Sequence, residues 1–203
     1  MKTVGCVLLM GGKSSRMGRD KAYLLHKGIP FWKIIVQEMM QCGETYISLD
    51  SMKRAPETDC SLILDEYSSI GPMGGIYSGL LHAKEEIVFF APCDMPIITA
   101  EMIRAIIAWY KDEYDGIILA GRDGKCYPTI GVYSRRLLPV LKERIRNKDY
   151  RLMGLLDEKN VKVLPIETLN IPKIELMNLN TWDDYLKFER IHSRKAETKE
   201  PLK

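Results

Sequence analysis

The stretch that most constrains the fold is the N-terminal segment from Val4 to Lys21. It begins with an apolar run, Val4 to Met10, whose length and β-branched residues are typical of a buried strand. The run stops at Gly11-Gly12 and is followed by residues rich in glycine, serine and positive charge. Glycines let the backbone turn tightly and leave its N–H groups open to an anion. The segment therefore predicts a buried strand that ends in an anion-binding loop.

Two common phosphate-binding motifs do not fit this loop. A Walker A loop has four residues between its glycines, whereas five separate Gly12 from Gly18, and the G-x-G-x-x-G pattern is also absent. The loop carries four cationic residues and one acid, namely Lys13, Arg16, Arg19 and Lys21 against Asp20. It can be a strand-to-helix turn with solvated charges or a cradle for a nucleoside triphosphate. The excess of positive charge favours the cradle.

The rest of the chain alternates apolar runs with helical patterns, which predicts an α/β fold with a mostly parallel sheet. Further strands are expected at residues 46–49, 61–64, 116–120, 127–133, 161–166 and 174–177, and one that begins at residue 87. Helices are expected at residues 31–42, 76–83, 135–145 and 182–191, and two more that begin after Thr99 and at residue 151. We expect a single domain over residues 1–192. The polar residues 193–203 are expected to form a disordered tail.

Composition excludes several classes of protein. A net charge of +3 over 203 residues is too small to predict binding to nucleic acid or to an anionic membrane. No apolar run is long enough to span a membrane, and the N-terminus does not resemble a signal peptide. The five cysteines are odd in number and have no C-x-x-C spacing, so we expect reduced thiols in a cytoplasmic protein. The three histidines have no metal-ligand spacing.

Three aspartates stand where predicted strands end: Asp50, Asp65 and Asp94. One such aspartate is commonly a turn former or a helix cap. Three in one sheet are more informative, because ligands of open α/β sheets bind beyond the carboxyl ends of the strands. Carboxylates repel a triphosphate unless a cation intervenes, and Mg²⁺ binds through one or two carboxylates together with phosphate oxygens. Asp94, flanked by Pro92 and Pro96, is the best candidate for the magnesium ligand.

The N-terminal loop also resembles a known family. The run Leu9-Met-Gly-Gly-Lys-Ser-Ser-Arg-Met-Gly-Arg-Asp-Lys21 is similar to the signature of the nucleotidyltransferases related to molybdenum cofactor guanylyltransferase. It departs from that signature at Met10, where the family usually has alanine. Asp50 is a second departure, since the family often has asparagine there.

The resemblance extends along residues 4 to about 186. Pro92-Cys-Asp-Met-Pro96 resembles the metal-binding motif of the family, and Asp65 with Gly71-Pro-Met-Gly-Gly75 resembles its nucleotide segment. Arg151-Leu152 and Asn178-Leu-Asn-Thr181 resemble its acceptor-side elements. On local pattern alone, Asn178 and Asn180 fit a helix cap and turn equally well.

The resemblance implies a three-layer, Rossmann-like nucleotidyltransferase fold. It implies transfer of GMP from MgGTP to the phosphate of molybdenum-molybdopterin, with Mg²⁺ as cofactor and pyrophosphate as second product. It is also compatible with cofactor-delivery proteins or molybdoenzymes as protein partners. The nucleotide-binding residues that it implies are Leu9, Met10, Gly11, Gly12, Lys21, Asp65, Gly71, Gly75 and Asp94. The implied catalytic residues are Arg16, Lys21 and Asp94, of which Asp94 is also the metal ligand. The implied acceptor-binding residues are Arg151, Asn178 and Asn180.

Several alternatives stay open at this point. The same loop and Asp94 would serve a cytidylyltransferase, or a nucleotidyltransferase acting on a sugar phosphate or methylerythritol phosphate. A non-catalytic GTP-binding partner or sensor is a different class, although it would be expected to have lost part of the set Arg16, Lys21 and Asp94. An unrelated α/β scaffold with similar loops is the third, since fold does not fix function.

Overall fold

The computed structural model describes residues 3–11, 20–96, 98–158, 160–169, 176 and 179–197, with the side chains of residues 192–197 excepted. Within these residues a seven-stranded sheet has the order β5-β4-β1-β6-β8-β7-β9. Its strands are β1 (Val4–Leu9), β4 (Thr45–Leu49), β5 (Ser61–Leu64), β6 (Ile87–Pro92), β7 (Gly116–Ala120), β8 (Cys126–Ser134) and β9 (Val161–Pro165). Strand β8 pairs antiparallel with β6 and β7, and every other pairing of the sheet is parallel. The predicted mostly parallel sheet is confirmed.

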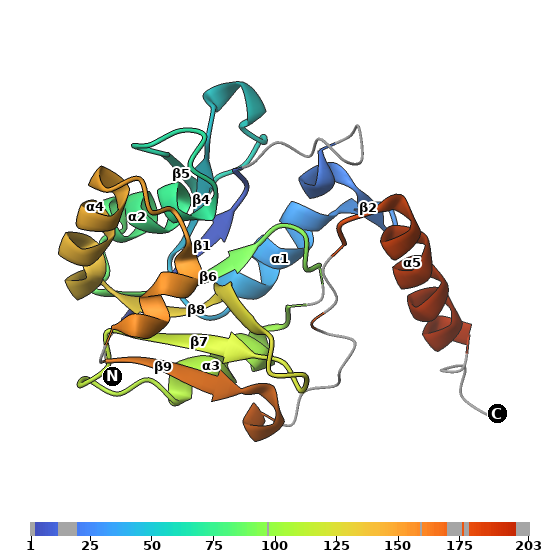
Figure 1. Ribbon diagram of the computed structural model, residues 1–203. Coiled ribbons are helices and arrows are strands. Elements are labelled where there is room, and N and C mark those ends of the chain that lie inside the picture. Colours follow the sequence, from blue (N-terminus) through green and yellow to red (C-terminus); the bar gives the residue numbers. More distant parts are fainter. Residues whose placement is uncertain are drawn as a thin grey trace.

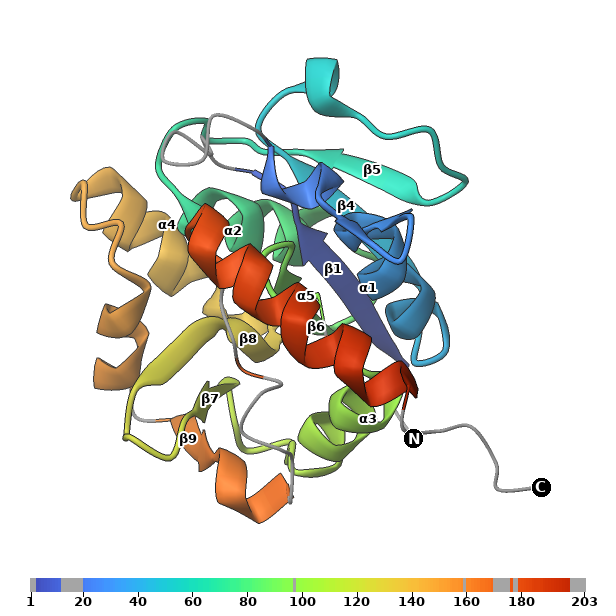
Figure 2. The same cartoon turned by 90° about the vertical axis from the view of Figure 1, so that its right-hand side faces the viewer.

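Helices cover both faces of this sheet, with α1 and α3 on one side and α2 and α4 on the other (Figures 1 and 2). The α-helices are α1 (Phe31–Met40), α2 (Pro72–His82), α3 (Ala100–Ala108), α4 (Leu138–Arg146) and α5 (Trp182–Glu197). The 3₁₀ helices are η1 (Lys21–Tyr23), η2 (Met52–Arg54), η3 (Arg135–Leu137), η4 (Leu152–Asp157) and η5 (Ile166–Leu169), and a small hairpin joins β2 (Leu25–His26) to β3 (Ile29–Pro30).

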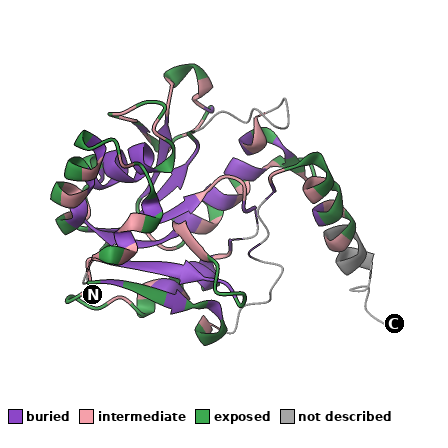
Figure 3. Cartoon of the chain, viewed as in Figure 1, coloured by how far each residue is buried: buried purple, intermediate pink, exposed green. Residues whose placement is uncertain are grey.

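Two hydrophobic cores follow from the alternation of side chains along the central strands. In β1, Cys6 and Leu8 belong to the core beneath α1 and α3, whereas Val7 and Leu9 belong to the core beneath α2 and α4. Figure 3 shows the central strands buried along their length while the outer faces of the helices are exposed. A parallel sheet needs both faces covered in this way, so the predicted three-layer architecture is confirmed.

The order of the strands places a switch point beside β1. The chain runs outward from β1 to β4 and β5, and then returns to the other side of β1 as β6. Leu9, the last residue of β1, pairs with Ser48 of β4 and with Pro92 of β6. Ligands of open α/β sheets bind beyond the carboxyl ends of the strands at such a point. The register therefore gathers the residues after β1, β4 and β6 at one place.

Helix α5 lies to one side of the sheet layers, next to the small hairpin (Figure 1). Phe188 of α5 packs edge-on against Phe31, with ring centroids 5.7 Å apart. The Tyr185 hydroxyl donates a hydrogen bond to the carbonyl of Leu25, and Glu189 pairs with His26 at 2.7 Å. The end of the described chain is thereby fastened to the segment that follows the glycine-rich loop.

Two predicted boundaries were wrong. Helix α2 begins at Pro72 rather than at residue 76, because Gly71 adopts a φ of 73° at its N-cap and the next glycines continue the helix. Helix α5 continues to Glu197, past its predicted end at Ile191, so residues 193–197 are helical rather than disordered. Residues 198–203 and, apart from Leu176, the predicted strand at 174–177 lie outside the described residues. No helix among the described residues is long and apolar enough to cross a membrane.

Candidate active site

A cavity of about 340 Å³ opens at the carboxyl ends of β1, β4 and β6. Its lining comes from the ends of β1, β4 and β6 and the residues that follow them, from the residue after β5, from the start of α2 and from one residue of β8. The lining residues are Leu9, Gly11, Lys21, Ser48, Arg54, Asp65, Gly71, Pro72, Gly75, Pro92, Cys93, Asp94 and Thr129. The size suits a small-molecule ligand, and cationic and anionic side chains share the same wall.

The first turn after β1 presents backbone to the cavity rather than a large side chain. The Met10 amide donates to the Ser48 carbonyl at 2.9 Å, which keeps the chain next to β4. The Met10 side chain is fully buried in the core beneath α1 and α3 and does not line the cavity. A β-carbon at Gly11 would come within 3.2 Å of Asp65 Oδ2, so a glycine suits this close approach. Any contact of Met10 with a ligand must therefore be made by its backbone.

Asp65 is held in the cavity wall by a buried serine. Ser48 has no exposed surface, and its hydroxyl donates to Asp65 Oδ1 at 2.6 Å. Burial raises the pKa of Asp65, while the hydrogen bond from Ser48 lowers it by favouring the ionised form. A β-carbon at Gly75 would come within 2.7 Å of both Ser48 Oγ and Leu9 Cδ2. Helix α2 can therefore approach this pair only with a glycine at that position.

Asp94 contacts a lysine that lines the same cavity. Lys21 Nζ lies 3.6 Å from Asp94 Oδ2 and donates a hydrogen bond of 2.8 Å to Asn180 Oδ1. Burial raises the pKa of Asp94, and the Lys21 ammonium opposes that rise. The Leu179 amide donates to the Asp94 carbonyl at 2.9 Å. The segments that carry Lys21, Asp94 and Asn180 are far apart in the sequence and meet at the Lys21 ammonium group.

Arg54 is a residue of the cavity wall that our sequence analysis missed. It lies in η2, in the loop after β4, and donates to Asp50 Oδ1 at 2.9 Å and to Asp20 Oδ2 at 2.8 Å. The spacing of Asp50 and Arg54, four residues apart in a polar loop, was the only local signal. Ser48 and Thr129 were also missed, because nothing local distinguishes them from other strand residues.

The first comparison with known proteins concerns the whole domain. The family model described as "MobA-like NTP transferase domain" matches residues 6–163. The chain belongs to the MobA-like NTP transferase family. The match includes residues of all seven strands of the main sheet described above and leaves out only the first two residues of β1 and the last two of β9. The family resemblance of the N-terminal loop is thereby confirmed.

Individual relatives of this MobA-like chain support the same family. It is 32% identical over 187 residues to a probable molybdenum cofactor guanylyltransferase of Flavobacterium johnsoniae, covering 91% of this chain and 95% of the relative. It is 30% identical over 190 residues to the molybdenum cofactor guanylyltransferase of Vibrio cholerae, covering 92% and 91%. The crystal structure of molybdopterin-guanine dinucleotide biosynthesis protein A from Archaeoglobus fulgidus has a TM-score of 0.80 at 23% identity, covering 94% and 99%. That structural match confirms the nucleotidyltransferase fold.

The MobA-like fold brings most of the predicted site residues together. Leu9, Gly11, Lys21, Asp65, Gly71, Gly75 and Asp94 all line the cavity, and Asn180 contacts Lys21. The predicted residues Gly12, Arg16 and Asn178 lie outside the described residues. Asp50 is at the expected strand end, and its carboxylate is engaged by Arg54.

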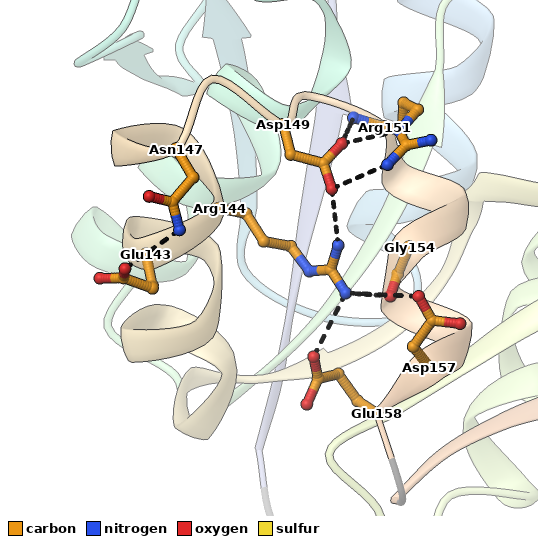
Figure 4. Close-up of polar contacts among 8 residues, drawn as sticks. All are labelled: Glu143, Arg144, Asn147, Asp149, Arg151, Gly154, Asp157 and Glu158. Carbon is orange, nitrogen blue, oxygen red and sulfur yellow. Dashed lines mark hydrogen bonds and ion pairs between the residues drawn. The ribbon is translucent and has the colours of Figure 1, made fainter.

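Arg151 is the predicted site residue that the described cavity does not include. It is exposed and donates from Nε to Asp149 Oδ1 at 2.8 Å, and Arg144 donates to the other oxygen of Asp149 at 2.9 Å (Figure 4). These two arginines lower the pKa of Asp149 to about 2. Arg144 also contacts Asp157, Glu158 and the carbonyl of Gly154, so it fastens the α4–η4 loop. Arg151 therefore lies at the anchored start of η4.

The state of the Cys93 thiol and the number of possible metal ligands decide what chemistry the cavity can support. Burial, and next the charge of Asp94, raise the pKa of the Cys93 thiol to about 12, so Cys93 stays protonated at neutral pH and is a poor nucleophile. Among the described residues no group of three or more histidines, cysteines and acids could hold a metal by itself. The Asp94 carboxylate fits a Mg²⁺ ion that takes its other ligands from water and substrate phosphates.

Proposed function

We propose that this MobA-like NTP transferase is a molybdenum cofactor guanylyltransferase, which transfers GMP from MgGTP to the phosphate of molybdenum-molybdopterin. The observation that carries the proposal is the contact of Lys21 with both Asp94 and Asn180. A lysine at the end of the glycine-rich loop stands between a candidate metal ligand and a candidate acceptor residue. Relatives named for this activity cover more than nine tenths of the chain, which supports the same assignment.

The reaction is an in-line displacement at phosphorus. An oxygen of the acceptor phosphate attacks the α-phosphorus of GTP, a new P–O–P linkage forms, and the bond to the β-phosphate breaks with release of pyrophosphate. The acceptor phosphate is already ionised at neutral pH, so it needs no general base. Positioning and neutralisation of charge supply most of the catalysis in such reactions. The residues of the cavity wall are of the types that these two tasks require.

Lys21, Arg16 and Asp94 act on the phosphate side. The Lys21 ammonium neutralises charge that develops on the leaving pyrophosphate, and Arg16 of the same loop adds a second cation. Asp94 would hold Mg²⁺, which would supply charge neutralisation and Lewis acidity at the phosphates. Lys21 gives up part of its contact with Asp94 when it turns to the triphosphate. Because Asn180 remains bound to Lys21, the acceptor side is held close to the reacting phosphorus.

The nucleoside occupies the part of the cavity between the end of β1 and the start of α2. There Gly11 lines the cavity without a side chain, and Leu9 provides an apolar wall. The roles of Met10 and Gly12 toward the nucleotide rest on the family motif. Asp65, held by Ser48, accepts hydrogen bonds from the nucleoside, and Gly71 and Gly75 allow a close approach. Arg151, Asn178 and Asn180 contact the pterin or its phosphate. Protein partners that deliver or receive the cofactor remain a further part of this proposal.

The test is a transfer assay with the purified chain. Incubation with MgGTP and molybdenum-molybdopterin is expected to release pyrophosphate and to form the guanine dinucleotide in equal amounts. Preference for CTP in a competition between equal concentrations would move the assignment to a cytidylyltransferase. Binding of GTP without turnover, with the acceptor checked by an authentic guanylyltransferase, would favour a nucleotide sensor.

A further inference from the structure

Arg54 joins two segments that reach the cavity from different directions. Its Nε and Nη2 both donate to Asp20 Oδ2, at 2.8 and 2.5 Å, and its Nη1 donates to Asp50 Oδ1 at 2.9 Å. About a quarter of each of the three side chains is exposed. A planar guanidinium binds two carboxylates at once through donors held in fixed directions, whereas an ammonium group is a point charge without this fork. Asp50 directly follows β4, while Asp20 ends the glycine-rich loop.

Asp20 in turn determines where Lys21 begins its helical turn. Its other oxygen, Oδ1, accepts a hydrogen bond from the Ala22 amide at 3.2 Å and so caps η1. The Tyr23 hydroxyl donates to the Arg54 carbonyl at 3.0 Å, which ties η1 to η2 a second time. Lys21 lies between these two links, next to Asp20 in the sequence. A change in the Arg54–Asp20 contact therefore moves the backbone that carries Lys21.

We propose that Arg54 is a positioning residue for the nucleotide, which acts through Asp20 to hold Lys21 in the cavity. This inference rests on the proposed function, because it assigns the held lysine to the triphosphate. Arg54 carries its effect through the fork of hydrogen bonds rather than through its charge alone. The order of action is Arg54 to Asp20, Asp20 to the cap of η1, and η1 to Lys21.

The experiment measures the Kd of MgGTP by calorimetry on the full chain. The wild type is compared with Arg54→Lys, which keeps the charge and removes the fork, and with Lys53→Met, which removes an exposed positive charge from the same η2 turn. Arg54→Lys is expected to raise Kd about tenfold, because charge-assisted hydrogen bonds to a carboxylate are lost. Lys53→Met is expected to change Kd less than about twofold. Equal Kd values for Arg54→Lys and the wild type would overturn the proposal.

A double-mutant cycle decides whether the effect passes through Lys21. In a Lys21→Ala background, Arg54→Lys is expected to change Kd by less than about twofold, since the group that it positions is gone. The same tenfold loss in both backgrounds would show that Arg54 acts independently, and would overturn the proposal. Should Arg54→Lys fail to fold in a thermal melt, Asp20→Asn replaces it in the cycle and reaches the same link from the other side. Asparagine keeps an oxygen for the Ala22 amide and loses the charge that binds Arg54.

The same cycle separates this inference from the proposed function. A wild type that binds MgCTP in preference to MgGTP would contradict guanylyl transfer, and the cycle run with CTP would still give the coupling between Arg54 and Lys21. If the wild type binds MgGTP but the losses of affinity caused by Arg54→Lys and Lys21→Ala are additive, only the proposed role of Arg54 is contradicted.

Discussion

The two sides of the cavity differ in how the chain builds them. The proposed nucleotide side comes from the ends of neighbouring strands. Leu9, Ser48 and Pro92 lie in register, and Leu49 pairs with Leu64 of β5. The residues that follow these strands place Gly11, Asp65 and Asp94 in the cavity. The proposed acceptor side comes from residues near residue 180, and Asn180 reaches Lys21 across 159 positions. Parallel pairing fixes the first side within the core of the sheet. The second side depends on a few contacts between segments outside the sheet, which include the Leu179 amide on the Asp94 carbonyl.

This difference predicts that nucleotide binding and acceptor binding can be impaired separately. Substitutions among strand-end residues should change the affinity for GTP or the rate of the chemical step. Substitutions near residue 180 should change the KM of the acceptor with little effect on GTP binding. Lys21 and Asp94 stand where the two sides meet, so they carry the largest effects.

The largest effect is expected from Asp94→Ala. Removing the candidate magnesium ligand should lower kcat at least about 100-fold, because the charge on the triphosphate is no longer balanced. Circular dichroism and the unfolding temperature should stay close to those of the wild type, since a partly exposed carboxylate is lost. Asp59→Ala, in the exposed loop before β5, is the matched control and should be as active as the wild type. Wild-type turnover by Asp94→Ala would remove this residue from the mechanism.

Lys21→Ala is expected to weaken MgGTP binding about 10- to 100-fold, the range for loss of a charged hydrogen bond. The measurement is the Kd in the absence of acceptor. Lys33→Ala, an exposed lysine on α1, serves as control for the loss of one positive charge. An unchanged Kd for Lys21→Ala would contradict the phosphate role and would leave its contact with Asp94 purely structural.

Asn180→Ala tests the acceptor side in isolation. It should raise the KM of molybdenum-molybdopterin about 3- to 10-fold, the effect of losing neutral hydrogen bonds. The Kd of MgGTP should change less than about threefold, because Asn180 binds Lys21 through a neutral amide oxygen and its loss leaves the ammonium charge unchanged. A loss of GTP affinity as large as that of Lys21→Ala would mean that the two sides cannot be separated.

The smallest effect concerns the pH dependence of nucleotide binding through Asp65. Its pKa is raised by burial and lowered by Ser48, so Ser48→Ala should raise it further. An acid with a raised pKa loses its charge at a higher pH, so the acid limb of MgGTP affinity should move to higher pH in Ser48→Ala. The affinity near pH 7.5 should fall less than about threefold. Ser61→Ala, exposed on β5, is the control, and coincident pH profiles for all three proteins would exclude Asp65 from the binding of GTP.

Most residues of the proposed nucleotide side could be predicted from the sequence, because the signals that mark them are local. Apolar runs end next to Gly11 and Asp65, and the pairing of parallel strands brings such ends together without further information. The same local view was wrong about α2, where glycines were interpreted as a turn although Gly71 alone makes the turn and the next glycines pack against Ser48 and Tyr67. A run of glycines in the sequence does not show which glycine forms the turn and which ones belong to the helix.

The contacts of Arg54 could not be predicted, for a physical reason. Arg54 and Asp20 are 34 positions apart, and neither belongs to a strand whose register would bring them together. Arg151 is a different case, since its acceptor role stays a prediction of the family motif, while the structure pairs its guanidinium with Asp149 outside the described cavity. Side chains on loops depend on tertiary contacts that the pattern of apolar residues does not encode.

The measurement that tests the central claim most directly follows the α-phosphate of GTP. GTP labelled at the α-phosphorus is incubated with the wild type, Mg²⁺ and molybdenum-molybdopterin, and the products are separated. We expect the label in the guanine dinucleotide and none in pyrophosphate, with transfer lost in Asp94→Ala. Label that stays in GTP, while an authentic guanylyltransferase converts the same acceptor, would contradict the account.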